Sequence, residues 1–549
     1  MRNFYKQDSL LQKLLKKHLP DDFFDYADRE LTHFGERVAG EIDERATHTD
    51  REGQPRLIKY DKMGNDISKV WVNEGYQATI DETYETGIVG YVHKEIPELG
   101  RKGNYFYSYA QGYLLSQSEP GFYCPVTLTM ATAYLIDHYA EEKLRAEFLP
   151  HVIATGYTEL YEGATFLTER QGGSDVGANE VEAVKDGDHY RLIGEKYFAS
   201  NSGTCGVAMV LARMEGARPG TKGLSLFLVP WEANRSSNGL TIRRLKDKLG
   251  VRAVPSAEIE LHGAKGYLVG EASQGFKYMM EALNLSRVCN AVASIGIMRR
   301  AYVEARDYAE DREAFGAPLT RYPMVQETLV NLAVKLEVET MAIFDMIKLF
   351  DEVTPQGMGA PEQDRTLLRL YIAILKKESA EQAIEFSHEA IEMHGGNGYI
   401  EDFVTPRLLR DAQVLTVWEG TANILGLEVL RLIEKFNAHE PYLSEMSRRL
   451  KEVQGPAKDL KQPVEQALDD LKQALVQLGT MSDSAKLMYP KKVAEDMALI
   501  LEAVVALEAV EDDRSHAVAE IYISENFDSE KYRAEPLASK HYEKIVHGS

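Results

Sequence analysis

The sequence predicts a mainly α-helical protein with a small antiparallel β-barrel domain near its centre. Two observations lead to this prediction. Long segments with apolar residues every three or four positions occupy both ends of the chain, and short β-rich runs separated by glycine turns occupy the middle. The 549 residues, 44% of them hydrophobic, are enough for about three to four domains. We divide the chain into an N-terminal helical domain (1–158), the β-barrel (159–275), a four-helix bundle (276–440) and a helical C-terminal extension (441–549).

The N-terminal domain is expected to be helical because its apolar residues recur at helical spacing. Leu128–Asp137 and Glu141–Ile153 are the clearest segments, and an irregular stretch at 47–75 interrupts the pattern. A basic amphipathic piece, Leu10–Leu19, is followed at once by the acidic segment 20–30. We interpret the two as consecutive helices rather than as a mitochondrial presequence.

The β-barrel is predicted from four short runs that glycine turns separate, and their hairpin spacing favours antiparallel pairing. The runs are His189–Gly194, Val207–Arg213, Leu224–Pro230 and Ala257–His262. Beyond Gly275 the helical period returns in four long segments, which predict a bundle. These are Gly275–Asp311, Pro323–Asp351, Gln363–His394 and Thr421–Asn437.

The C-terminal extension is predicted to contain three further helices before a polar tail, over Leu443–Gln454, Gln462–Leu478 and Pro490–Val510. Residues 441–549 contain 14 basic and 20 acidic side chains, a balance of -6. This charge suits a docking or self-association module better than a nucleic-acid arm.

Composition excludes several classes of protein. The formal net charge of -23 repels nucleic acid and anionic lipid, and no basic patch of convincing size offsets it. Cys124, Cys205 and Cys289 are far apart and odd in number, which argues against disulfides or a zinc site and indicates a reducing compartment. No apolar run reaches the length of a membrane span, and the start of the chain lacks a secretory apolar core. We expect a cytoplasmic protein.

The segment 411–423 contains the strongest candidate for a catalytic base. Glu419 follows an apolar stretch ending in Trp418 and precedes Gly420 and Thr421. Apolar flanks would raise the pKa of this carboxyl towards neutrality, as a general base requires. Thr421 is a suitable N-cap for the helix that follows. Taken alone, the segment also fits a glutamate that only stabilises the start of that helix.

Two segments of the β region suit a flat, phosphate-bearing ligand. Gly172, Gly173 and Ser174 can present backbone N–H groups and a hydroxyl to a phosphate, although a plain glycine turn fits as well. Phe198 and Ser200 lie two residues apart on one face of a strand. An aromatic plane beside a hydroxyl can hold a heterocycle, although an aromatic residue in a strand usually belongs to a core.

Two helix ends of the bundle are also candidates. Arg312, before Phe315 and Gly316, either binds a phosphate or caps its own helix. Gly395 and Gly396 form a glycine loop that a ligand can approach. His388 and His394 are six residues apart and do not share a helix face, so we assign no metal. The common dinucleotide, nucleotide-triphosphate and hydrolase motifs do not occur.

The order of these motifs resembles the acyl-CoA dehydrogenase superfamily over Phe122–Asn437. The motifs run from Leu-Thr-Glu-x-x-x-Gly-Ser-Asp-Val and Lys-Tyr-Phe-Ala-Ser-Asn through Asp-Arg-Glu-Ala-Phe-Gly and Gly-Gly-Asn-Gly-Tyr to Trp-Glu-Gly-Thr. The resemblance implies a helical domain, a β-barrel and a four-helix bundle, with FAD held between domains and subunits of a homo-oligomer. It implies α,β-dehydrogenation of an acyl-CoA, with an electron-transferring flavoprotein as the electron acceptor.

The resemblance also implies roles for single residues. Glu419 matches the base that removes the α-proton, its backbone N–H matches a donor to the thioester oxygen, and Arg287 matches a basic residue near CoA. The positions that match FAD contacts are Leu167, Thr168, Ser200 and Phe198 at the flavin ring, Gly173 and Ser174 at the pyrophosphate, Arg312 and Phe315 towards a neighbouring subunit, and Gly395, Gly396, Thr421 and Asn423 in the nucleotide cradle.

Three departures from the pattern matter. Pro323 stands where many relatives have a FAD-contacting Gln, a role that Gln326 could take. Trp418 stands where many have Tyr, which would reshape the acyl pocket. The segments 60–66 and 124–130 resemble the bacterial alkylation-response flavoprotein branch, which is associated with DNA and is a poor dehydrogenase. A lipid- or DNA-binding flavoprotein and an acyl-CoA oxidase therefore remain alternative functions.

Overall fold

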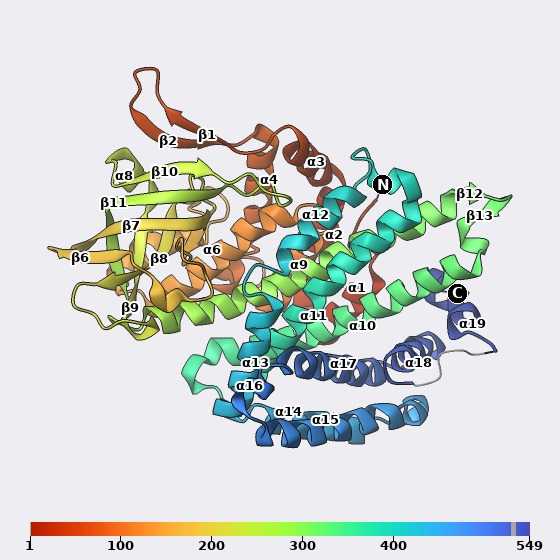
Figure 1. The fold of residues 1–549 in the computed structure, drawn as a ribbon. Coiled ribbons are helices and arrows are strands. Elements are labelled where there is room, and N and C mark those ends of the chain that lie inside the picture. The colour runs from red at the N-terminus through yellow and green to blue at the C-terminus, as the bar shows by residue number, and fades with distance from the viewer. Residues whose placement is uncertain (1, 529–533, 549) are drawn as a thin grey trace. The chain divides into compact units, whose positions relative to one another are not determined.

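Long helices and one large closed sheet make up most of the computed structural model, which describes residues 2–528 and 534–548 (Figure 1). The predicted class, mainly helical with a small central β domain, is confirmed. The chain forms two compact units. The first contains the chain up to Gln12 and Leu19–Cys289, and the second contains Lys13–His18 and the chain from Asn290 onward. The boundaries fall inside helices α1 (Ser9–His18) and α9 (Gly275–Asp311).

Most of the first unit before the sheet is helical, as its apolar spacing predicts. Helix α5 is buried along its whole length, and in α6 the side chains from Leu128 to Ile136 are all buried. A two-stranded hairpin, β1 (Arg56–Tyr60) with β2 (Asp66–Trp71), occupies the stretch expected to be irregular. Its β1 strand has no buried residue, so no apolar alternation reveals it in the sequence. The helices of this part are α2 (Asp21–Arg37), α3 (Asp43–Arg51), α4 (Glu74–Glu85), α5 (Tyr105–Leu115), α6 (Pro120–Tyr139) and α7 (Glu142–Val152).

The large sheet closes on itself, because β11 pairs with β7 and β9, and these strands connect through β6 and β8. Most neighbours are antiparallel, but β8 runs parallel to β5 and β6. Hairpin spacing predicts only the pairing of strands that follow one another, so it does not reveal these two pairs. The strands are β5 (Gly163–Phe166), β6 (Glu182–Asp186), β7 (His189–Ser200), β8 (Val207–Met214), β9 (Leu224–Pro230), β10 (Leu240–Leu245) and β11 (Ser256–Val269).

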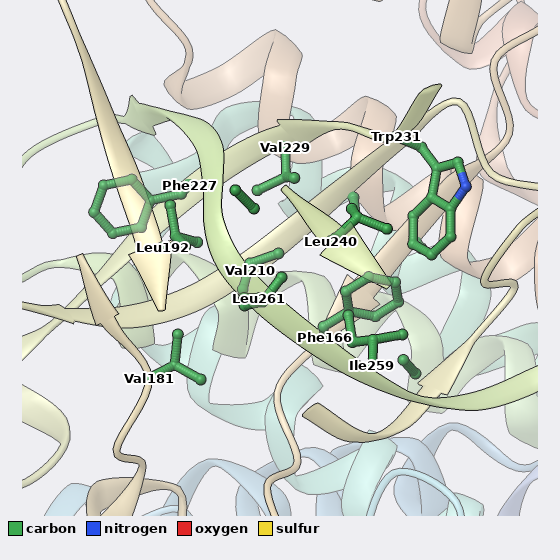
Figure 2. Packing of buried hydrophobic residues seen from close by; sticks show 14 of the residues in the cluster. Phe166, Val181, Leu192, Val210, Phe227, Val229, Trp231, Leu240, Ile259 and Leu261 are labelled. Atoms are coloured by element: carbon green, nitrogen blue, oxygen red, sulfur yellow. The ribbon is translucent and has the colours of Figure 1, made fainter. Parts of the chain in front are cut away.

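The inward-facing residues of this barrel form a continuous apolar core (Figure 2). Phe166, Phe227 and Leu192 come from three different strands, and Trp231 closes the core from the short helix α8 (Trp231–Ser236). The rings of Phe166 and Trp231 meet edge to face at 6.3 Å. The alternation of buried and exposed residues along the strands therefore sets which side chains face outward, including those of the candidate site.

The second unit contains the predicted long helices. The observed bounds of α9 agree with the predicted segment, and α10 (Pro323–Val353), α11 (Glu362–His394) and α13 (Ala422–Phe436) differ from theirs by at most two residues. A further helix, α12 (Thr405–Leu415), was not predicted from the sequence. It lies between the glycine loop and Glu419, and Pro406 occupies its first turn.

The C-terminal extension packs on the bundle inside the second unit. Helices α14 (His439–Glu452), α15 (Gln462–Thr480) and α17 (Pro490–Glu508) occupy the predicted positions, and α17 contacts α10, α11 and α13 (Figure 1). The expected polar tail instead contains α18 (Asp513–Phe527), which begins with a capping box between Asp512 and Ser515, and α19 (Leu537–Tyr542). Among the described residues, no helix is both long enough and apolar enough to cross a membrane.

Candidate functional site

Glu419 lies on the short loop between α12 and α13. The backbone N–H groups of Val417 and Trp418 both donate to the Val414 carbonyl oxygen at 2.9 Å, which ends α12 in a tight turn. Glu419 then takes a left-handed φ of 60°, and Gly420 follows at 112°. A left-handed backbone is costly for a residue with a Cβ, and such positions cluster at functional sites. The glutamate side chain is half-buried.

Thr421 is the N-cap residue of α13, but its side chain makes no capping hydrogen bond. The predicted position is therefore correct, while the predicted hydroxyl cap is not formed. Thr421 and Asn423 are both exposed, whereas Trp418 is half-buried. Lys376, on α11, was not predicted as a site residue. Its Nζ donates to the Gly420 carbonyl oxygen at 2.8 Å.

The glycine loop 395–399 follows α11. Gly395 has a left-handed φ of 56°, which favours glycine, and a Cβ added at Gly395 or Gly396 would meet no heavy atom within 4 Å. The backbone is thus open to an approaching ligand at both positions. His394 is buried, and its ring stacks on Tyr308 at 4.1 Å while Nδ1 lies 2.7 Å from the Ala390 carbonyl oxygen.

Arg312 and Phe315 belong to a small hairpin of β12 (Glu313–Ala314) and β13 (Ala317–Pro318) that follows α9. Phe315 and Gly316 form its turn with φ values of 53° and 86°. The turn leaves the Phe315 side chain 98% exposed. Arg312 is also exposed, and its backbone N–H continues the helix by donating to Tyr308. Gln326 donates its side-chain amide to the Thr320 carbonyl oxygen at 2.9 Å.

In the first unit, Leu167 and Thr168 follow strand β5 and are held by buried polar groups. The Leu167 carbonyl oxygen accepts from Asn179 at 2.7 Å and from Lys196 at 3.3 Å, and the Thr168 carbonyl oxygen accepts from the Tyr197 N–H at 2.9 Å. These bonds fasten the segment alongside β7. Asn179 and Lys196 therefore support the predicted flavin positions, and no sequence motif indicates this role for them.

The turn after this segment depends on glycine. A Cβ on Gly173 would lie 2.6 Å from the Thr168 hydroxyl oxygen, so a larger residue there would displace Thr168. Gly172 has a φ of 116° and faces open space. Ser174 is exposed. The turn therefore presents an accessible backbone and a hydroxyl, as a phosphate group requires.

Phe198 and Ser200 lie on β7, with buried Ala199 between them. The Phe198 side chain is 55% exposed, so it does not belong to the barrel core. The Nζ of Lys246 lies 4.5 Å from the centre of its ring, and Ser200 Oγ lies 3.1 Å from Ser256 Oγ. An exposed aromatic face beside a hydroxyl fits a flat cofactor ring.

The structure thus gathers the candidate residues in two sets, one in each unit. The first unit contains Leu167, Thr168, Gly173, Ser174, Phe198 and Ser200, together with Arg287, which is buried on α9 and donates to Asn284 at 3.3 Å. The second contains Arg312, Phe315, Gln326, Gly395, Gly396, Trp418, Glu419, Thr421 and Asn423. The open glycine backbones and the exposed Phe198 ring are compatible with FAD.

Comparison with known proteins identifies the domains of the chain. Residues 164–264 match the middle domain and residues 273–433 the C-terminal domain of acyl-CoA dehydrogenases, and residues 1–159 match the N-terminal domain of the adaptive response protein AidB. The chain is 34% identical to acyl-CoA dehydrogenase family member 11 of Caenorhabditis elegans, over 88% of this chain and 79% of the relative. It is 30% identical to the putative acyl-CoA dehydrogenase AidB of Escherichia coli K12, over 77% of each.

Solved structures give the same result. The crystal structure of Caenorhabditis elegans ACDH-11 in complex with C11-CoA has a TM-score of 0.89 at 29% identity, covering 100% of this chain and 95% of that one. Bd2924 in its apo form has a TM-score of 0.83 at 32% identity, covering 95% and 98%. Fold and site together define a FAD-dependent oxidoreductase that acts on acyl-CoA. The chain belongs to the acyl-CoA dehydrogenase family, and its N-terminal domain assigns it to the AidB-like branch.

Proposed function

We propose that the protein converts an acyl-CoA to the trans-2-enoyl-CoA, with Glu419 as the base that removes the α-proton. The main support is the left-handed φ of Glu419, a conformation typical of functional sites, at a half-buried carboxylate in the loop between two helices. The backbone N–H of Glu419 would donate to the thioester oxygen as negative charge develops there. Bound FAD supplies the acceptor for the hydride that leaves the β-carbon.

The remaining candidate residues would bind FAD and CoA and orient them. Leu167, Thr168, Phe198 and Ser200 would hold the flavin ring, and Gly173 and Ser174 the pyrophosphate. Gly395, Gly396, Thr421 and Asn423 would complete the nucleotide site, with Gln326 in place of the Gln that Pro323 replaces. Arg287 would bind CoA. Trp418, next to the base, would set the shape of the acyl pocket, because an indole ring takes more space than a phenol ring.

Anaerobic bleaching of the bound flavin by a panel of acyl-CoAs tests this proposal. The panel should run from short to long chains and include a C11 thioester, which is the ligand in the ACDH-11 complex. Glu419→Gln should keep FAD but bleach about 100- to 10,000-fold more slowly, since a general base contributes that much. Glu385→Gln, an exposed glutamate on α11, is the matched control and should bleach like the wild type. Bleaching by Glu419→Gln at the wild-type rate would eliminate this assignment.

The electron acceptor and cellular location belong to the same proposal. An electron-transferring flavoprotein would reoxidise the enzyme, and reoxidation by dioxygen instead would identify an acyl-CoA oxidase. Stopped-flow reoxidation with each acceptor separates the two.

Cys124, Cys205 and Cys289 form no disulfide in the described part of the chain, which supports a cytoplasmic location.

A homo-oligomer is proposed from the exposed hairpin of Arg312 and Phe315. An aromatic side chain that is 98% exposed at the tip of a tight turn is costly in water, and a second subunit with its FAD would cover it. Phe315→Ala should lower the native mass measured by light scattering and reduce FAD content. An unchanged mass and FAD content would remove this residue from the interface.

A second function is favoured by the AidB-type N-terminal domain over residues 1–159. In that case the flavoprotein would bind lipid or DNA with little dehydrogenation. The net charge of -23 argues against the DNA variant, because phosphate binding needs a basic surface. Titration with a DNA duplex at several salt concentrations decides this point. Tight binding that weakens steeply with salt would favour the second function.

A further inference from the structure

We infer that Lys376 is a positioning residue that locks the loop of Glu419 into its left-handed conformation. The inference rests on the proposed role of Glu419 as the base and adds a residue to that site. Lys376 lies in the middle of α11 and is only 1% exposed. A lysine is rarely buried to this degree unless its ammonium group meets acceptors that offset the loss of water.

One of those acceptors belongs to the loop of Glu419. The Lys376 Nζ donates to the Gly420 carbonyl oxygen at 2.8 Å, across 44 residues of sequence. The carbonyl belongs to the peptide that joins Gly420 to Thr421, directly after Glu419. A charge-assisted hydrogen bond to this oxygen restrains the ψ angle of Gly420 and therefore the direction in which the chain enters α13.

This restraint matters because the loop is strained at two consecutive positions. Glu419 has a φ of 60°, in a region that a residue with a Cβ rarely adopts, and Gly420 has a φ of 112°. Such conformations cost about 1–3 kcal/mol and persist only when neighbouring contacts hold them. Thr421 contributes no side-chain cap at this point. The buried ammonium group of Lys376 is thus a contact from another helix that can maintain the loop.

The consequence concerns geometry at the reacting carbon. Both groups assigned to Glu419, its carboxylate and its backbone N–H, precede the restrained peptide by one residue. A loop that relaxes towards an ordinary φ would rotate both groups together. A displacement of about 1 Å costs about 100-fold in rate, whereas binding of a long substrate depends on many other contacts. Loss of Lys376 should therefore lower kcat much more than it raises KM.

Lys376→Met tests the inference, and Lys377→Met is its matched control. Lys377 is the next residue on α11, is also buried, and donates instead to Glu381 on its own helix at 2.8 Å. With purified flavoprotein and the best acyl-CoA of the panel, Lys376→Met should lower kcat about 100-fold. KM should change less than about threefold, and FAD content should match that of the control. Equal losses of kcat in both variants would overturn the inference.

Hydrogen exchange supplies a readout that does not depend on turnover. In Lys376→Met, amide exchange of the peptide that covers 416–424 should accelerate at least about tenfold relative to Lys377→Met, because the loop is no longer fastened. Unchanged exchange there would overturn the inference even if activity fell. If the wild type bleaches with no acyl-CoA, the proposed function fails, but the exchange result still decides the role of Lys376. If Lys376→Met does not fold, Lys376→Gln replaces it under the same criteria. The glutamine side chain is shorter than that of lysine and does not reach the Gly420 carbonyl oxygen.

Discussion

Two mostly buried lysines, one in each unit, are neutralised in different ways. In the first unit, Lys196 forms an ion pair with Glu169 at 2.7 Å, and the oxygens of Glu169 also accept the backbone N–H groups of Glu180 and Val181. In the second unit, Lys335 on α10 contacts three carboxylates. They are Glu339 at 3.2 Å, Glu378 at 3.0 Å and Glu502 at 2.9 Å. One cluster is balanced in charge, and the other contains two more acids than bases.

A proton held by one of the three acids reduces this imbalance. Burial, followed by repulsion from Glu502, raises the pKa of Glu339 well above its usual range. Burial also acts to raise the pKa of Glu378, but attraction to Lys335 outweighs it and holds that pKa below the usual value. Oxygens of the three carboxylates lie within 4.8 Å of one another. Of Glu339 and Glu378, Glu339 is therefore the acid that holds a proton more readily.

The difference shows how the C-terminal extension is attached to the bundle. Glu339 and Glu378 belong to α10 and α11, whereas Glu502 belongs to α17, and Tyr522 of α18 donates its hydroxyl to Glu502. The link thus joins α10 and α11 of the bundle to α17 and α18 of the extension through one lysine and the acids around it. The Lys196 pair instead closes within the β-barrel and needs no proton, because backbone donors complete it.

The largest expected effect comes from Lys335→Met. Removing the ammonium group leaves the buried acids of the cluster without their counter-charge, and breaking a buried ion pair costs about 3–5 kcal/mol. We expect the free energy of unfolding of the second unit to fall by about 5 kcal/mol, measured by urea titration. Lys348→Met, at an exposed position of α10, is the control and should change little.

Lys196→Met should cost less, about 3 kcal/mol, because Glu169 keeps two backbone N–H donors. The same titration, followed through hydrogen exchange of the barrel strands, gives the value. Lys222→Met, which is exposed in the same domain, controls for the substitution. A larger loss for Lys196→Met than for Lys335→Met would contradict the comparison between the two clusters.

The smallest expected effect is the pH dependence that Glu339 imposes. Its pKa is raised in the folded protein, so above about pH 4.5 the unfolded chain releases a proton that the folded chain keeps. This contribution to stability is full at acid pH and is lost as pH rises towards the folded pKa, by about 1.4 kcal/mol per pH unit.

Glu339→Gln should remove this loss, because the amide remains neutral at every pH. Urea titrations of both proteins at about pH 6, 7 and 8 measure the difference. Glu337 lies on the same helix as Glu339 and pairs with Arg514 of α18 at 2.8 Å. Glu337→Gln is the control and should retain the wild-type pH dependence. Parallel pH profiles for wild type and Glu339→Gln would show that Glu339 is ionised and that the cluster is neutralised in another way.

Local patterns account for the parts of the structure that were predicted correctly. The segment Gly275–Asp311 was predicted with its observed bounds because its helical period is uninterrupted. Strand β9 was predicted equally well, since glycines precede its apolar run. The candidate loop, with Glu419 before a glycine and a helix start, was recognisable from the same kind of pattern. Helix α12 and strands β6 and β10 were missed because they are short or carry mixed charged and apolar residues.

What the sequence determined by itself is the set of elements, the glycine positions that free the backbone, and the motif order that reveals the family. Only the tertiary structure decided which charges meet. Lys335 reaches Glu502 across 167 residues, and Lys376 reaches the carbonyl oxygen next to Glu419 from another helix. The physical reason is that helical period depends on neighbours three or four residues away, whereas partners of a buried charge are chosen by how distant helices pack.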